Sequence, residues 1–190
     1  MAKGRRAAAF IAVVLCASLF AVPVVAGDAP PQPSGYRLGD YRSPTPARLT
    51  GATTVSDSEA MALWKSGSAL FIDVMPRPLR PPNLPAGTVW RQPERRNIPG
   101  SAWLPNTGYG VLSEPVADYF ATSLARLTGG DREKPLLIYC LEDCWMSWNA
   151  AKRALVLGYR NVYWFPEGTD GWTRIGGPLE TAEPIPEGTP

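Results

Sequence analysis

The chain has 190 residues, of which 45% are hydrophobic and 19% charged, with 19 Lys and Arg residues against 17 Asp and Glu. This composition is typical of a globular protein with one core-forming domain, and it excludes a disordered or collagen-like chain. The sequence contains no histidine. Catalysis by Ser-His-Asp or Cys-His groups, and a metal site held by histidines of this chain, are therefore excluded.

Residues 1–26 predict a cleaved secretory signal. Three basic residues precede an apolar run from Ala7 to Val25, and small residues end that run before Gly27. A membrane anchor is the alternative, because the run approaches the roughly 20 residues that span a bilayer. Pro23 interrupts the run, however, and polar, Pro-rich sequence follows it. We therefore expect an exported, periplasmic protein without a stable membrane anchor.

Cleavage would change both the charge and the cysteine count. Removing the three basic residues of the signal from the 19 Lys and Arg would leave 16 against 17 acidic residues, a net charge near −1. Binding to nucleic acid is therefore not indicated. Cys16 would also be lost, which leaves Cys140 and Cys144 in an oxidising compartment.

The first elements after the signal are an arm, a helix and a strand. Residues 27–51 are rich in Pro and Gly and predict an extended arm. A capping box from Ser56 to Glu59 predicts the start of a helix that ends at Gly67. The apolar run Ala69–Val74 is typical of a buried strand.

The rest of the chain repeats this alternation of strands and helices. The pattern predicts a strand over Ser101–Leu104, a helix after Ser113, a strand over Pro135–Cys140, a helix over Ser147–Leu157, a strand over Asn161–Phe165 and a helical turn near Trp172. It indicates one α/β domain over residues 52–178, with a mostly parallel five-stranded sheet and helices on both faces. Residues 179–190 predict an acidic, Pro-rich tail that is loosely held.

Cys140 is the strongest candidate for chemistry, because it follows a buried strand and precedes a helix, where ligands of α/β sheets bind. Loop N–H groups and the helix N-terminus favour a thiolate there. Lowering its pKa from about 8.5 to about 6.5 needs roughly 2.7 kcal/mol, whereas a helix dipole supplies about 0.3 to 1 kcal/mol. The loop amides must supply the rest, and Glu142 and Asp143 act against them.

Three residues separate Cys144 from Cys140 in the loop that Cys140 opens. A disulfide between them would contribute about 2 kcal/mol at most, because the closed loop is so short. A redox or resolving role therefore explains the pair better than a structural staple. Two inert buried cysteines are the alternative.

Segments spread over residues 52–175 carry a resemblance to a known family. They are FIDV at 71–74, NIPGSA at 97–102, IYC at 138–140, GYRNV at 158–162 and Gly171-Trp172. On these residues the chain resembles a rhodanese-like domain. The segment Tyr139–Ala151 (YCLEDCWMSWNAA) is similar, more narrowly, to an exported family associated with PQQ-dependent catabolism and named for its CXXCW motif.

The resemblance implies that Cys140 takes a sulfane sulfur from a donor such as thiosulfate, as a persulfide, and passes it to a thiol or cyanide. It also implies a substrate-binding loop whose backbone amides at 141 to 146 stabilise the anion. The loop residues are Leu141, Glu142, Asp143, Trp145, Met146 and Ser147. The spacing from Cys140 to Ser147 is one residue longer than in the common sulfurtransferase loop and predicts a wider pocket.

Three positions depart from the family pattern. Met146 stands where the phosphatase branch of this superfamily has a phosphate-gripping arginine, which argues against phosphatase activity. Met75 replaces a common arginine, and Asn97 replaces a common histidine before Ile-Pro-Gly. The loop over 75–97 carries five arginines and six prolines. It is either a solvated excursion or a surface for an anionic partner.

Two functions follow from these observations and the resemblance. In the first, the protein is an exported sulfurtransferase or thiol redox protein accessory to PQQ-dependent alcohol catabolism, with Cys144 as the resolving thiol and a small sulfur-containing anion or a protein thiol as partner. In the second, it is a non-catalytic module for a periplasmic quinoprotein alcohol dehydrogenase, which Trp145 and the 75–97 loop contact while Cys140 and Cys144 form a disulfide. We expect no bound metal or cofactor; PQQ enters through the pathway only.

Overall fold

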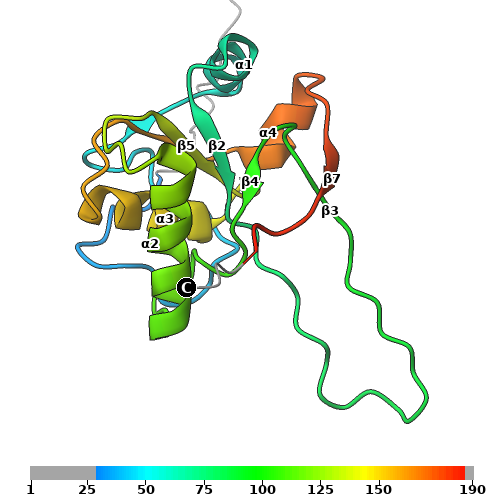
Figure 1. Cartoon of the computed structure of the whole chain (residues 1–190). Helices are drawn as coiled ribbons and strands as arrows, with labels where there is room; N and C mark the ends of the chain where they lie inside the picture. The colour runs from blue at the N-terminus through cyan, green and yellow to red at the C-terminus, as the bar shows by residue number, and fades with distance from the viewer. Residues whose placement is uncertain (1–28, 187–190) are drawn as a thin grey trace, which may run out of the picture.

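A computed structural model describes residues 29–186. The predicted signal at 1–26 lies outside the described residues. Five parallel strands form the central sheet in the order β1-β6-β5-β2-β4 (Figure 1). Their bounds are Thr53–Thr54 for β1, Val162–Phe165 for β6, Leu136–Tyr139 for β5, Leu70–Asp73 for β2 and Ala102–Trp103 for β4. The predicted five-stranded parallel sheet is confirmed.

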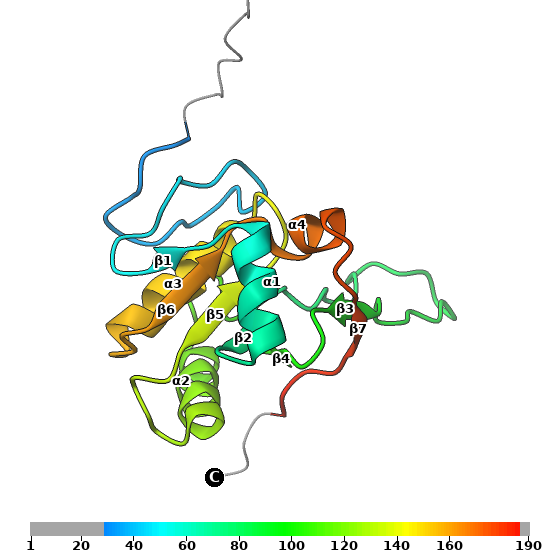
Figure 2. The same ribbon diagram turned by 90° about the horizontal axis from the view of Figure 1, so that it is seen from above.

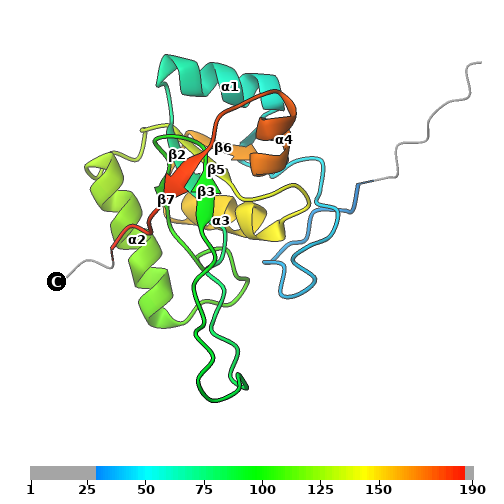
Figure 3. The same cartoon turned by 90° about the vertical axis from the view of Figure 1, so that its right-hand side faces the viewer.

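Helices cover both faces of this sheet, as predicted (Figure 3). The described residues form α1 over Asp57–Ser66, α2 over Glu114–Thr128, α3 over Trp145–Val156 and α4 over Gly168–Arg174. Ala60 of α1 and Trp172 of α4 pack with Phe71 on one face. Phe120 of α2 and Trp148 of α3 belong to the core on the other face.

The predicted capping signals place α1 correctly. The Ser56 side chain accepts the N–H of Glu59, and the Glu59 carboxylate accepts the N–H of Ser56 at 2.8 Å. Gly67 ends the helix in the left-handed region at φ 61°. By contrast, α3 begins at Trp145, two residues before the predicted Ser147, with Cys144 as its N-cap residue.

Both ends of the described chain are held against the domain. The arm before β1 buries Leu49 in the core. Near the other end, β7 over Glu180–Ala182 pairs antiparallel with β3 over Arg95–Asn97, and Ile185 N donates to the carbonyl of Trp103 at 2.9 Å. The expectation of a loosely held tail is therefore wrong as far as residue 185, because backbone pairing fixes it. The sequence pattern missed this ribbon, which has no continuous apolar run.

The 75–97 loop projects away from the body of the domain before it returns as β3 (Figure 1). Most of its side chains are exposed. None of the helices formed by residues 29–186 is both long and apolar enough to cross a membrane.

Candidate active site

The two cysteines lie at the carboxyl edge of the sheet. Cys140 directly follows β5, the middle strand, and Cys144 precedes α3. Both are free thiols, with Cys140 fully buried and Cys144 2% exposed. Three residues lie between the two cysteines. Cys144 directly precedes α3, because the helix starts at Trp145. The wider pocket at the loop stays a prediction.

The surroundings of the two thiols shift their pKa values in opposite directions. Hydrogen bonding from Cys140 lowers the pKa of Cys144 to about 6, against the opposing effect of burial. The backbone N–H groups of Met146 and Leu141 and the charge of Arg42 make smaller contributions to this lowering. Burial, followed by its interaction with Cys144, raises the pKa of Cys140 well above the ordinary range. The surroundings of the pair therefore favour the charged form of Cys144 over that of Cys140.

A buried ion pair lies beside Cys140. Asp73, at the end of β2, is fully buried, and its Oδ2 accepts from Arg95 Nε at 2.7 Å. Burial raises the pKa of Asp73, while the charge of Arg95 lowers it. The Nη2 of Arg95 is also buried and has no hydrogen-bond partner. The charge of Cys140 raises the pKa of Arg95, so the two groups interact electrostatically. The cysteine loop contains no basic residue, and the Arg95 guanidinium supplies a positive charge near Cys140.

Glu142 and Asp143 contribute less to the thiol environment than we expected. Glu142 Oε2 forms an ion pair with Arg174 Nη2 at 2.8 Å, which offsets its charge. Asp143 is exposed and adopts φ 53°, so it forms the turn of the loop. The carboxylate that raises the pKa of Cys140 is the buried Asp73.

The loop amides are partly occupied by other groups. Glu142 N donates to Asp170 Oδ2 at 3.0 Å, and Trp145 N donates to the carbonyl of Tyr41 at 2.9 Å. The predicted anion cradle from 141 to 146 is therefore incomplete. Leu141 N favours the charged form of both thiols, and Met146 N favours that of Cys144.

The remaining predicted site residues support the loop from within the fold. Trp145 is 2% exposed, so the expectation that it docks a partner is wrong for this conformation. Met146 is buried. Ser147 Oγ donates to the Cys144 carbonyl at 2.9 Å and accepts from Trp164 Nε1 at 3.0 Å, which fixes the first turn of α3. Leu141 is half-buried against the core.

The N-terminal arm lies beside the loop that leads into α3 (Figure 2). Arg42 forms a β-bridge with Cys144, and Ser43 N donates to the Asp143 carbonyl at 3.0 Å. The guanidinium of Arg37 stacks over the Trp145 ring at 5.1 Å. The buried side chain of Asn149 bonds the backbone N–H and carbonyl of Arg37, each at 2.9 Å. Sequence reasoning missed these contacts, because the arm has no apolar periodicity.

Two neighbouring residues complete the surroundings of the thiols. The Sγ of Cys140 lies 3.6 Å from the Sδ of Met75, which also lines a cavity described below. Tyr109, on the opposite wall of that cavity, has its pKa raised by burial, by Tyr41 and by Cys144. Within residues 29–186, no group of three or more His, Cys, Asp or Glu side chains is placed to hold a metal ion.

The fold and the loop define a class of protein: a parallel α/β domain with a cysteine at the carboxyl end of its middle strand. The family model described as "Rhodanese-like domain" matches residues 56–175. The chain therefore belongs to the rhodanese-like domain family. The comparison with curated proteins found no match.

Solved structures similar to this chain include proteins whose names describe sulfur transfer. A thiosulfate sulfurtransferase from Pseudomonas aeruginosa is 18% identical, with a TM-score of 0.48, over 73% of this chain and 22% of that chain. A rhodanese-like domain from Anabaena sp. is 17% identical over 75% and 89%, with a TM-score of 0.45. A polysulfide-sulfur transferase homodimer from Wolinella succinogenes is 20% identical over 68% and 79%, with a TM-score of 0.42.

Proposed function

We propose that this protein transfers sulfane sulfur through Cys140 and Cys144 acting as a pair. The observation that carries the proposal is a pair of buried free thiols at the carboxyl end of the middle strand, each of which shifts the pKa of the other. A base within hydrogen-bond reach of a nucleophile activates it. Cys144 is that base, and Cys140 is the nucleophile.

The first steps form a persulfide on Cys140. The Cys140 proton passes to the Cys144 thiolate, and the Cys140 thiolate attacks the outer sulfur of thiosulfate. The S–S bond of thiosulfate breaks, and sulfite leaves with the electron pair. The nearby guanidinium of Arg95, whose Nη2 lacks a partner, stabilises the negative charge on the sulfur of Cys140.

The second half resolves the persulfide. The proton returns from Cys144 to the outer sulfur of the persulfide, and the Cys144 thiolate attacks the Cys140 sulfur. The Cys140–Cys144 disulfide forms, and the outer sulfur leaves as HS⁻. In this step the outer sulfur is reduced and the Cys144 sulfur is oxidised, while the Cys140 sulfur keeps its oxidation state. An external dithiol must therefore reduce the disulfide before another turnover.

Intact-mass measurement after exposure to thiosulfate or polysulfide tests this function. We expect an adduct of one sulfur atom that is absent in Cys140→Ser and persists longer in Cys144→Ser than in wild type, because resolution is blocked. Unmodified protein whose Cys140–Cys144 disulfide resists mild reduction would overturn the proposal.

The biological setting is a further part of the proposal and is supported by the sequence alone. The signal-like residues 1–26 support export to the periplasm, and the similarity of Tyr139–Ala151 to the CXXCW family supports a role in PQQ-dependent alcohol catabolism. N-terminal sequencing of the periplasmic form should begin at Gly27. An uncleaved N-terminus, or protein recovered only from the cytoplasm, would contradict export.

The second candidate is a non-catalytic module that binds a periplasmic quinoprotein alcohol dehydrogenase while Cys140 and Cys144 form a disulfide. The observation that favours it is the exposed, arginine-rich 75–97 loop, which projects from the domain (Figure 1). Co-purification with the dehydrogenase should then be lost when Arg80 and Arg91 are changed to Gln. Equal recovery with the double variant, or none with wild type, would count against this role.

A further inference from the structure

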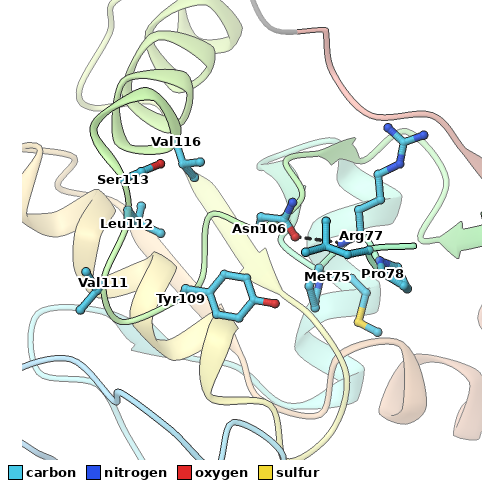
Figure 4. Close-up of a pocket in the computed structure, with 11 residues that line it drawn as sticks. Met75, Arg77, Pro78, Asn106, Tyr109, Val111, Leu112, Ser113 and Val116 are labelled. Atoms are coloured by element: carbon cyan, nitrogen blue, oxygen red, sulfur yellow. Dashed lines mark hydrogen bonds between the residues drawn. The ribbon is translucent and has the colours of Figure 1, made fainter. Parts of the chain in front are cut away.

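A cavity beside the thiols has no role in the mechanism above. It has a volume of about 630 Å³, within the range of about 300 to 1,000 Å³ typical of small-molecule sites. It lies between the base of the 75–97 loop and the segment that leads into α2 (Figure 4). Its walls are mostly apolar and include Pro76, Pro78, Leu79, Tyr109, Leu112 and Val116.

The polar groups at this cavity do not make it an anion site. Arg77 is the one basic residue that lines it, and its guanidinium points away from the interior (Figure 4). The Oδ1 of Asn106 is already bonded to the backbone N–H of Arg77 at 3.1 Å. At the rim, Leu79 and Val111 are 86% and 77% exposed. An apolar ligand would cover these side chains, whereas an inorganic dianion would lose its hydration without replacement.

The inner wall of the cavity adjoins Cys140 through Met75. Met75 lines it, and its Sδ lies 3.6 Å from the Sγ of Cys140. Tyr109 lines it from the other side and is close enough to Cys144 for that thiolate to influence it. A methionine side chain has three rotatable bonds and repacks readily. Rotation of Met75 therefore connects the cavity to the sulfur of Cys140.

We propose that this cavity binds the organic group of an apolar thiol or of its persulfide and presents the sulfur to Cys140 once Met75 rotates. The inference rests on the proposed function and names its substrate class. The Cys140 thiolate attacks the outer sulfur of R–S–SH, the bond between the two substrate sulfurs breaks, and R–S⁻ leaves with the electron pair. The proton stays on the transferred sulfur, and no oxidant is needed. The reverse reaction loads an apolar thiol.

Rates of sulfur loading from two donors test this inference. The donors are benzyl hydropersulfide, generated in solution, and inorganic polysulfide. Val116→Trp fills the cavity and should slow loading from the benzyl donor about tenfold or more, the scale of steric discrimination in an apolar pocket, without slowing loading from polysulfide. Val156→Trp is the matched control, because Val156 is 73% exposed and does not line this cavity. It should leave both rates unchanged.

Two further measurements separate failure of this inference from failure of the proposed function. Met75→Ala should speed loading from the benzyl donor. If Val116→Trp slows both donors equally and Met75→Ala brings no gain, the cavity inference alone is overturned. If neither donor loads Cys140, the proposed function fails. Benzyl methyl sulfide, an unreactive probe, should still shift the NMR signal of the Met75 methyl group in wild type and not in Val116→Trp. Absence of that shift would overturn the inference as well.

Discussion

The two ends of the cysteine loop lie in opposite electrostatic surroundings. Cys140 is buried at the end of the sheet beside Met75, and burial, Cys144 and the buried Asp73 carboxylate disfavour its charged form. Cys144 adjoins the N-terminus of α3 and the basic side chain of Arg42, which favour a thiolate. The pKa values of thiols four positions apart are therefore shifted in opposite directions. The fold gives the two thiols different roles, because the sheet surrounds the proposed nucleophile Cys140, whereas a helix N-terminus and the arm surround the proposed base Cys144.

The largest predicted effect concerns the Cys140 end. Arg95→Gln leaves the fully buried Asp73 without its partner, and we expect a loss of about 3 to 5 kcal/mol in the free energy of unfolding. The loss of Arg95 raises the pKa of Asp73 in the folded protein further. The unfolded chain therefore releases the Asp73 proton at a lower pH than the folded protein does. The destabilisation should therefore increase as the pH rises above the ordinary carboxyl range. Urea unfolding across this range measures it.

Two variants control this experiment. Arg95→Gln combined with Asp73→Asn removes both charges and should recover much of the lost stability. Arg96→Gln, at the exposed neighbouring position on β3, should have little effect. If the double variant is no more stable than Arg95→Gln alone, the unpaired charge is not the cause of the loss.

The second prediction concerns the arm at the Cys144 end. Asn149→Ala removes two hydrogen bonds to the backbone of Arg37 and one to the carbonyl of Gly108. We expect a loss of about 1 to 3 kcal/mol and faster alkylation of Cys144, because the arm detaches from the loop. Iodoacetamide labelling followed by peptide mass spectrometry measures the rate. Asn161→Ala, which removes one exposed bond, is the control; equal labelling of the two variants would show that the arm does not shield Cys144.

The sheet, the helices and the position of Cys140 could be predicted because each depends on local pattern: a capping box, a short apolar run, a glycine after a helix. The surroundings of the thiols could not. Arg95 comes from a polar ribbon and Arg42 from an arm without periodicity, and both reach the loop through long-range packing. The sequence shows that the loop lacks a cation but cannot show which distant segment supplies one. The start of α3 was misplaced because Cys144 is an uncommon N-cap residue.

The third prediction concerns the proton shared by the pair. In wild type, alkylation of Cys144 should follow a titration near its pKa of about 6. Cys140→Ala removes the hydrogen bond that most strongly lowers this pKa, so the titration should move toward the ordinary thiol range; Cys140→Ser, which keeps a donor, should lie between. In wild type the pKa of Cys144 is lower in the folded protein than in the unfolded chain, so between these two values the unfolded chain binds more protons. The contribution of Cys144 to stability should therefore rise with pH over that window. In Cys140→Ala the rise should flatten; an unchanged titration would show that Cys140 does not hold the proton.

The smallest effect is expected from the acidic turn between the cysteines. Arg174→Gln frees Glu142 from its ion pair, and the freed carboxylate should raise the pKa of Cys144 slightly. Both partners are about half exposed, so water and salt screen their charges. The same alkylation titration at low and at high salt should therefore show a small shift at low salt that disappears at high salt. A shift as large as that of Cys140→Ala would mean that surface charge, and not the bond between the two thiols, determines which sulfur is ionised.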